Sequence, residues 1–274
     1  MGTTVGEWLL SANALLTRVG IGTAHLDAVV LLEDCIKHDR AWILAHTEHP
    51  LSEEHLARLN EQLNRRAQHE PLSYIRNKTE FYGREFYIDH RVLEPRPESE
   101  TMIDMLKSLH LPREITVIDV GTGSGALAIT ARLEVPRADV MATDLDPEAL
   151  KVAEQNCEKH SCDIDFLKGN LLKPFYLHYH PRHSVVLANL PYVPDSFHIN
   201  PAAMREPRAA IFGGPDGLDL YRELFEQVDP LPYKPLYILT EAMPPQHELL
   251  RSIASRHHYR QSAYDDFIQV FRPA

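Results

Sequence analysis

The chain has 274 residues, a length that suits one large domain or a large one plus a small one, and its composition, with 44% hydrophobic and 24% charged residues, is typical of a globular protein. Its net charge of -11 disfavours binding of nucleic acid through the phosphates, which requires a basic face. Three cysteines (Cys35, Cys157 and Cys162) without a CxxC pair indicate neither a disulfide framework nor a zinc ribbon. No apolar run reaches the roughly 18 residues of a membrane span, and no signal-peptide pattern opens the chain, so we expect a cytoplasmic protein without a membrane partner.

The first 72 residues are predicted to form a small helical domain. Apolar residues recur at helical spacing in residues 8–16 and 26–36. A third helix is expected to begin at Ser52, because a serine side chain can cap the free N–H groups of a helix and two glutamates follow it.

Residues 73–93 are predicted to form a β-hairpin that links this helical domain to the rest of the chain. Aromatic and β-branched residues stand on both sides of the turn Gly83-Arg84. After the linker, prolines bound a loop over residues 94–98, which leads into a helix over residues 99–109.

From residue 115 to the C-terminus, predicted strands and helices alternate. The strands are expected at 115–120, 138–145, 163–169, 184–190, 235–242 and 267–274, and the helices at 126–133, 147–160, 218–227 and 246–255. This alternation, with nearly continuous apolar strands, predicts an α/β fold whose mostly parallel sheet carries helices on both faces. In that architecture ligands bind beyond the carboxyl ends of the strands.

A glycine-rich turn follows the first of these strands, in the string DVGTGSGALA that begins at Asp119. Glycines allow a backbone to approach a ligand closely, and the following helix N-terminus presents free N–H groups. Asp144 ends the next strand, where a carboxylate can accept hydrogen bonds from both hydroxyls of a ribose. The candidate cofactor contacts of the turn are Gly121, Thr122, Gly123 and Gly125.

The details of this turn distinguish between nucleotide classes. A dinucleotide fingerprint reads GxGxxG, whereas this chain has GxGxG and no Lys-Ser/Thr of a P-loop. Asp119 would repel a pyrophosphate but suits the cationic methionyl part of S-adenosylmethionine. A dinucleotide site and a ligand-free turn remain alternatives at this point. The string resembles motif I of the Rossmann-like class I methyltransferases, and this resemblance implies S-adenosylmethionine as the cofactor.

Asn170 and Leu171 follow the third expected strand. In the methyltransferases that the chain resembles, an acidic or amide residue here faces the adenine amino group, and the side-chain oxygen of Asn170 can accept such a hydrogen bond. A turn asparagine without a ligand is the alternative.

The fourth expected strand ends in Asn189-Leu190-Pro191-Tyr192, which resembles the [N/D/S]PP[Y/F/W] motif of methyltransferases that modify planar nitrogens. The lone pair of such a nitrogen is delocalised, so it attacks a methyl group poorly. Asn189 and a nearby backbone carbonyl can accept hydrogen bonds from the NH₂ group, orienting the nitrogen and favouring the positive charge that develops on it. Tyr192 can pack against the flat acceptor, and Asn189, adjoining the donor, is also a candidate cofactor contact.

Leu190 stands where the motif usually has its first proline. The group expected to act at this position is the backbone carbonyl, which leucine retains. The same Asn-Leu-Pro-Tyr string occurs in rRNA adenine dimethyltransferases, so the tetrapeptide alone does not choose the substrate.

Over nearly its full length the chain resembles the HemK/PrmC family of protein-(glutamine-N5) methyltransferases. Further segments that carry the resemblance are EPLSYI at 70–75 with EFYG at 80–83, VLEPRPESE at 92–100, EPRAA at 206–210 and GGPDGLDLYR at 213–222. The resemblance implies a substrate, the glutamine of the Gly-Gly-Gln motif in peptide chain release factors. It also implies a docking domain over residues 1–72, a linker over 73–93 and a methyltransferase domain over 94–274, in a protein expected to be a monomer without direct nucleic-acid contact.

Two other substrates and one non-enzymatic role remain alternatives. A sister family methylates a glutamine of a ribosomal protein, but its loop usually reads PRSP, whereas PRPESE at residues 95–100 favours the release-factor branch. DNA or RNA adenine-N6 methylation shares the acceptor motif, and the acidic charge opposes it. A scaffold protein that retains the fold without turnover is the third alternative. Ser99, Asn170 and the segment 240–246, which matches the family's late E-I-G-x-x-Q only loosely, depart from the family pattern.

Two further groups of residues are candidates for a site. His178, His180 and His183 lie close together, but no cysteine or carboxylate with ligand spacing accompanies them, so we expect a solvated loop and no metal. Arg96 and Glu98 are interpreted either as residues of the cofactor pocket or as members of structural ion pairs.

Overall fold

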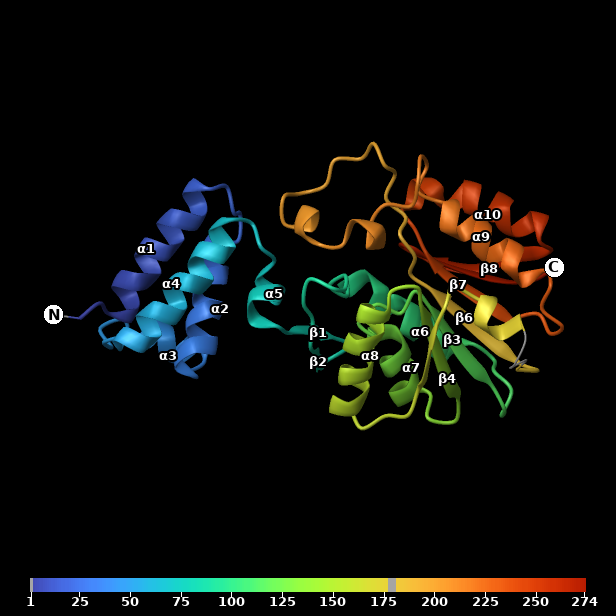
Figure 1. Cartoon of the computed structure of the whole chain (residues 1–274), viewed down its shortest axis with the longest axis horizontal. Helices are drawn as coiled ribbons and strands as arrows, with labels where there is room; N and C mark the ends of the chain where they lie inside the picture. Colours follow the sequence, from blue (N-terminus) through green and yellow to red (C-terminus); the bar gives the residue numbers. More distant parts are fainter. Residues whose placement is uncertain (1, 177–180) are drawn as a thin grey trace. The chain divides into compact units, whose positions relative to one another are not determined.

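The computed structural model describes residues 2–176 and 181–274. The chain divides into two compact units (Figure 1). The first unit comprises the chain up to Asn77 together with the segment Asn200–Arg205, and the second comprises Lys78–Ile199 and Glu206–Ala274.

The first unit is a helical bundle, as the sequence predicts. Its helices are α1 (Val5–Arg18), α2 (Ala24–Ile36), α3 (Arg40–Ala45), α4 (Glu53–Ala67) and α5 (Leu72–Arg76). Ser52 caps α4 by accepting a hydrogen bond from the backbone N–H of His55, so the predicted start of this helix is confirmed. The helices α3 and α5 were not predicted, because six and five residues are too short to show an apolar period. A buried ion pair between Arg66 and Asp27, 2.6 Å apart, joins α4 to α2.

The second unit begins with the predicted β-hairpin, formed by β1 (Thr79–Phe81) and β2 (Arg84–Phe86). Its turn is one residue earlier than expected, at Tyr82-Gly83, and both residues have positive φ angles of 53° and 67°. Two such residues give the backbone the twist that matches a tight hairpin. Phe81 and Phe86 are both buried and anchor the hairpin to the core of this unit.

A seven-stranded sheet forms the centre of the second unit, with the order β5-β4-β3-β6-β7-β9-β8. The strands are β3 (Thr116–Val120), β4 (Asp139–Asp144), β5 (Asp165–Lys168), β6 (Ser184–Ala188), β7 (Tyr237–Glu241), β8 (Tyr259–Asp265) and β9 (Ile268–Pro273). Strands β3 to β7 are parallel, and β9 pairs antiparallel with both β7 and β8. The predicted α/β fold with a mostly parallel sheet is confirmed. The edge strand β8 was not predicted, because most of its residues are exposed and show no apolar alternation.

Helices cover both faces of this sheet (Figure 1). They are α6 (Glu100–Ser108), α7 (Ala126–Glu134), α8 (Pro147–Lys159), α9 (Asp219–Val228) and α10 (His247–Arg256). Short 3-10 turns occur at Pro97–Ser99, Lys173–Tyr176, Ala203–Arg205, Arg208–Ala210 and Pro244–Gln246. Successive residues of β3 point to opposite faces, so Val117 joins the core beneath α6, α7 and α8, and Ile118 joins the core beneath α9 and α10.

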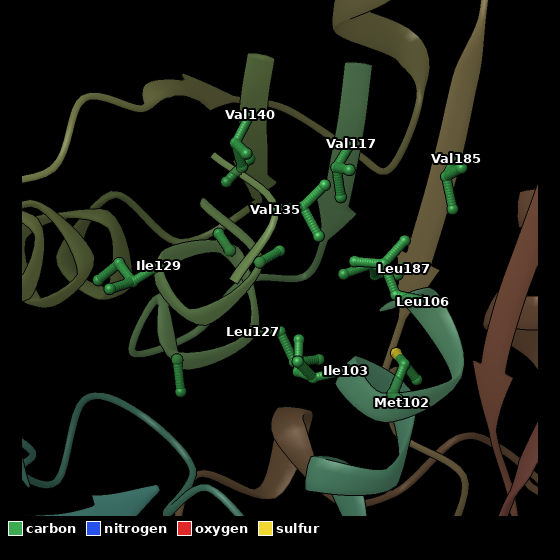
Figure 2. Packing of buried hydrophobic residues seen from close by; sticks show 14 of the residues in the cluster. Met102, Ile103, Leu106, Val117, Leu127, Ile129, Val135, Val140, Val185 and Leu187 are labelled. Carbon is green, nitrogen blue, oxygen red and sulfur yellow. The ribbon is translucent and has the colours of Figure 1, made fainter. Parts of the chain in front are cut away.

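Figure 2 shows the first of these two cores from close by. Met102, Ile103 and Leu106 of α6 lie beside Leu187 of β6 and Leu127 of α7, and all five side chains are buried. This packing holds α6 and α7 against the sheet, and the two segments that precede these helices both reach the site described below. Within the described residues, no helix is long and apolar enough to cross a membrane.

Candidate active site

A cavity of about 500 Å³ lies at the carboxyl ends of the parallel strands of the second unit. Most of the site residues predicted from the sequence line it: Gly121, Thr122, Gly123, Asp144, Asn170, Leu171, Asn189, Leu190 and Pro191. The predicted residues Asp119, Gly125 and Tyr192 are not among its lining. The cavity has the size and the largely apolar wall of a site for a small organic ligand.

Gly121 and Gly125 give the loop after β3 its shape. Gly125 precedes α7 with a φ of 80°, and a Cβ atom there would lie 3.1 Å from the side chains of Ala153 and Ile129. It therefore allows α7 to pack closely against α8, although it does not line the cavity. Gly121 has a φ of 73°, and a Cβ atom there would lie 3.0 Å from Leu190 Cδ2, so the loop after β3 and the predicted acceptor motif touch at this point.

Asp144 is the last residue of β4, and its carboxylate is hydrogen-bonded to the glycine-rich loop after β3. Its Oδ2 accepts a hydrogen bond from the backbone N–H of Gly123 at 2.9 Å, and its Oδ1 accepts one from the backbone N–H of Asp146 at 2.9 Å. Burial raises the pKa of the Asp144 carboxyl. Each carboxylate oxygen has a further lone pair, so this residue can still accept hydrogen bonds from the two hydroxyls of a ribose.

Asp119 lies beneath the loop rather than on the cavity wall. Its side chain accepts hydrogen bonds from Thr122 Oγ1 at 2.6 Å and from the backbone N–H of Ala128 at 3.2 Å. Burial raises the pKa of this carboxyl to about 7. Asp119 therefore joins the glycine loop to the first turn of α7, and its direct contact with a methionyl group stays a prediction.

Asn170 lines the cavity beyond β5. Its Nδ2 donates a hydrogen bond to Glu223 Oε1 at 2.8 Å, which leaves Oδ1 as the end of the amide that can accept a hydrogen bond from a ligand. The next residue, Leu171, is buried, and its backbone carbonyl accepts a hydrogen bond from Thr143 Oγ1 at 2.9 Å.

The cavity fits an adenosyl ligand by three separate features. Its volume is sufficient, the carboxylate of Asp144 stands at the end of β4, and the amide oxygen of Asn170 stands beyond β5. These are the acceptor groups that ribose hydroxyls and an adenine amino group require.

A second, smaller cavity of about 70 Å³ adjoins the first. Tyr192 and Glu241 line this second cavity, and Asn189, Leu190 and Pro191 line both. The residues that follow β6 therefore stand where the two cavities meet. A group held in the smaller cavity would approach a ligand of the larger one past Asn189.

Asn189, itself half-buried, belongs to a network of hydrogen bonds that ends at the buried carboxyl group of Glu241. Its Nδ2 donates to Ser99 Oγ at 2.8 Å, Ser99 Oγ donates to Glu241 Oε2 at 2.6 Å, and the Tyr192 hydroxyl donates to Glu241 Oε1 at 3.1 Å. Burial raises the pKa of the Glu241 carboxyl to about 7, and the hydrogen bonds from Ser99 and Tyr192 oppose this shift. Burial raises the pKa of the Tyr192 phenol, and the nearby Glu241 carboxylate raises it further.

Tyr221 and Gln246 brace the backbone of the same segment. The Tyr221 hydroxyl accepts a hydrogen bond from the Leu190 backbone N–H at 3.2 Å and donates one to the backbone carbonyl of Glu241. Gln246 Nε2 donates to the backbone carbonyl of Tyr192 at 2.7 Å.

Four contributors to the site were not predicted from the sequence: Ser99, Tyr221, Glu241 and Gln246. A signal for two of them was present, since Glu241 and Gln246 keep the first and last positions of the family's E-I-G-x-x-Q. The residues between Glu241 and Gln246 differ from the motif, so the match was judged loose although both contacting side chains are retained.

The proline-bounded loop and the segment after the acceptor motif meet at Arg96. Arg96 lines both cavities and pairs with Glu206, whose Oε1 lies 2.6 Å away. The other carboxylate oxygen of Glu206 accepts the backbone N–H of Glu94 at 3.0 Å. Both interpretations of Arg96 from the sequence therefore apply, because it belongs to an ion pair and to the cavity wall.

Two of the three clustered histidines, His178 and His180, lie outside the described residues. Among the residues that the structure does describe, no group of three histidines, cysteines or carboxylates is placed to hold a metal ion.

Comparison with known proteins gives family matches in both units. The family model of the PrmC N-terminal domain matches residues 7–76, and that of ribosomal protein L11 methyltransferase (PrmA) matches residues 97–191. The chain is 35% identical over 225 residues to a release factor glutamine methyltransferase of Deinococcus radiodurans, covering 80% of this chain and 78% of the relative. The corresponding protein of Bacillus subtilis is 32% identical over 233 residues, covering 82% and 80% of the two chains.

Solved structures share the fold at lower sequence identity. The hMettl16 catalytic domain, solved in complex with a hairpin of the MAT2A 3'UTR, aligns with a TM-score of 0.53 at 14% identity, over 81% of this chain and 82% of its own. A methyltransferase from Pyrococcus furiosus aligns with a TM-score of 0.51 at 15% identity, over 81% and 98% of the two chains. These likenesses show the class I methyltransferase fold alone. The relatives of 32–36% identity show that the chain is an S-adenosylmethionine-dependent enzyme that belongs to the release factor glutamine methyltransferase family.

Proposed function

We propose that this protein transfers a methyl group from S-adenosylmethionine to the side-chain amide nitrogen (N5) of the glutamine in the Gly-Gly-Gln motif of peptide chain release factors. The observation that carries the proposal is the position of Asn189, where a cofactor-sized cavity meets a small cavity suited to a planar acceptor. The names of the close relatives support the same substrate.

The residues of the acceptor motif would compensate for the weak nucleophilicity of an amide nitrogen. S-adenosylmethionine supplies a methyl group on a positively charged sulfur. Asn189 Oδ1 and the backbone carbonyl of Leu190 would accept the two N–H groups of the glutamine amide and hold its nitrogen in line for attack. The same acceptors favour the positive charge that develops on this nitrogen. Pro191 and Tyr192 would pack against the flat amide and keep water away from it.

We assign cofactor binding to the residues around the larger cavity. Gly121, Thr122 and Gly123 would provide close backbone approach, Asp144 would accept the ribose hydroxyls, and Asn170 would accept the adenine amino group. The remaining assigned residues are Asp119 and Gly125, which shape the loop from outside the cavity, together with Leu171 and Asn189.

We further propose that the helical unit docks the release factor and that the enzyme acts as a cytoplasmic monomer on protein rather than on nucleic acid. The net charge of -11 supports a protein partner, because binding to phosphates requires a basic face.

A methylation assay with three acceptors tests the proposed function. The protein and labelled S-adenosylmethionine are incubated with a purified release factor, with ribosomal proteins, or with DNA and RNA. We expect label in the release factor, and none when the glutamine of its Gly-Gly-Gln motif is changed to alanine. Label that persists in this variant, or label in ribosomal protein or nucleic acid alone, would refute the proposed substrate.

A further inference from the structure

We propose that Ser99 and Glu241 are positioning residues, which determine that the oxygen end of the Asn189 amide, and not its nitrogen end, faces the acceptor. The proposal rests on the role of Asn189 in the proposed function. It concerns two residues that stand outside the acceptor motif in the sequence; Ser99 lines the larger cavity and Glu241 lines the smaller one.

The chemistry of the carboxylate sets the direction of every hydrogen bond in the network. An ionised carboxylate only accepts, so Glu241 receives the hydroxyl protons of both Ser99 and Tyr192. Ser99 has a single hydroxyl proton, and this proton is used in its bond to Glu241. The Ser99 oxygen can then only accept from Asn189, and the group of Asn189 that donates is Nδ2, at 2.8 Å. The amide oxygen is the end that remains for a ligand at the junction of the cavities.

Burial of Ser99 and Glu241 strengthens the hold of this network on the Asn189 amide, and the direct hydrogen bond between Asn189 and Glu241 acts in the same sense, because a carboxylate can accept only from Nδ2. Ser99 is 2% exposed and Glu241 is 0% exposed, so bulk water does not compete for their hydrogen bonds. In such surroundings a satisfied network is rigid, and an unpaired polar group is costly. The network also joins three separate elements, because Ser99 precedes α6, Asn189 follows β6 and Glu241 ends β7.

The opposite orientation of Asn189 would be unproductive. If the Ser99 proton were not used by Glu241, the hydroxyl could donate to Asn189 Oδ1 and the amide could turn over. Nδ2 of Asn189 would then face the N–H groups of the glutamine amide, placing donor against donor. Such a site would still bind the cofactor, but it would hold the acceptor nitrogen poorly.

The test uses three variants of the full-length protein and one matched control. Ser99→Ala removes the hydroxyl, Glu241→Gln replaces an acceptor-only group by one that also donates, and Ser99→Thr keeps the hydroxyl. The control is Thr240→Val, which changes a buried residue next to Glu241 on β7 whose hydroxyl makes no hydrogen bond within the described part of the chain.

We expect Ser99→Ala and Glu241→Gln to lower kcat on a release factor about tenfold or more, the effect of losing one hydrogen bond to a charged or buried group. The dissociation constant for S-adenosylmethionine, measured by calorimetry, should stay within about twofold, because Asp144 and Asn170, which are assigned to the ribose and the adenine, are held by hydrogen-bond partners outside this network. Ser99→Thr and Thr240→Val should keep kcat near that of the unchanged protein. Equal kcat values for all four variants, or a loss in Ser99→Thr as large as in Ser99→Ala, would overturn the proposal.

A second readout needs no acceptor and therefore separates this proposal from the proposed function. Hydrogen exchange of the Asn189 side-chain NH₂ group is followed by nuclear magnetic resonance, with the signal assigned by its loss in Asn189→Asp. We expect slow exchange in the unchanged protein and in Ser99→Thr, and faster exchange in Ser99→Ala. Fast exchange of the Asn189 NH₂ group in the unchanged protein would overturn the positioning role. If this exchange is slow but no methyl group is transferred to release factors, only the proposed substrate is overturned.

Discussion

The backbone N–H of Leu190 donates a hydrogen bond to the hydroxyl oxygen of Tyr221, 3.2 Å away. A proline, which the acceptor motif usually has at this position, carries no N–H and could not make this bond. The Tyr221 hydroxyl in turn donates a hydrogen bond to the backbone carbonyl of Glu241 at the end of β7, so it links the Leu190 backbone to this strand. The departure from the motif at Leu190 is therefore integrated into the structure, and its backbone carbonyl is retained.

Leu190→Pro should destabilise the protein. The change removes one buried hydrogen bond, worth about 1 kcal/mol, and removes side-chain atoms that pack against Gly121, for a total loss of about 1–3 kcal/mol in the free energy of unfolding. Urea denaturation measures this loss. The cost should be smaller by about 1 kcal/mol when the substitution is made in a Tyr221→Phe background, where the hydrogen-bond partner is already absent. Equal costs in the two backgrounds would contradict a stabilising Leu190–Tyr221 bond.

Asn189→Ala should remove nearly all methyl transfer while S-adenosylmethionine binding is largely kept. Loss of a hydrogen-bond acceptor that acts on developing charge lowers kcat by roughly 10²–10³-fold. Initial rates on a release factor, together with calorimetric titration of the cofactor, distinguish this effect from a folding defect. Turnover at the rate of the unchanged protein would rule out the proposed mechanism.

Asp144→Asn should weaken S-adenosylmethionine binding by about tenfold or more. The substituted amide keeps one acceptor oxygen, so it cannot hold the Gly123 and Asp146 N–H groups and also accept from a ribose as the carboxylate can. The matched control is Asp139→Asn, which makes the same change at the exposed opposite end of β4. Comparable dissociation constants for these two variants would exclude Asp144 from the cofactor site.

Turnover should rise with pH through about 7, the pKa to which burial raises the Glu241 carboxyl. Below this pH the carboxyl is neutral, and its proton must be donated to Ser99 or Tyr192, which disturbs the direction of the hydrogen bonds. The other titratable groups that act on Glu241 or respond to it are Glu98 and Tyr221. Glu98 adds negative charge, which favours the protonated form, and Tyr221 stays neutral because burial raises its pKa well above the usual value.

A pH profile of kcat from 5.5 to 8.5, about 1.5 units on either side of 7, measures this effect. Asp119 also has a pKa raised to about 7, so cofactor affinity is measured over the same range to separate the two carboxyls. The acidic limb of kcat should flatten in Glu241→Gln, which cannot titrate. A limb of unchanged shape in that variant would assign the pH dependence to another group.

Local sequence patterns were sufficient for most of the fold. The buried strand ending at Val120, the glycines after it and Asp144 at the next strand end are all short-range features, so they predict both the α/β architecture and the cofactor loop. The helix α3 and the strand β8 were not predictable in the same way, because one is too short and the other too exposed to show an apolar period.

For the site, the sequence by itself determined which residues carry the cofactor loop and the acceptor motif, since each of these is contiguous in the chain. Only the tertiary structure decided how Asn189 is oriented. Ser99 lies 90 positions before Asn189 and 142 before Glu241, so no spacing in the sequence connects the three residues. Packing of α6, β6 and β7 brings them within hydrogen-bond distance, and burial away from water gives their hydrogen bonds a fixed direction.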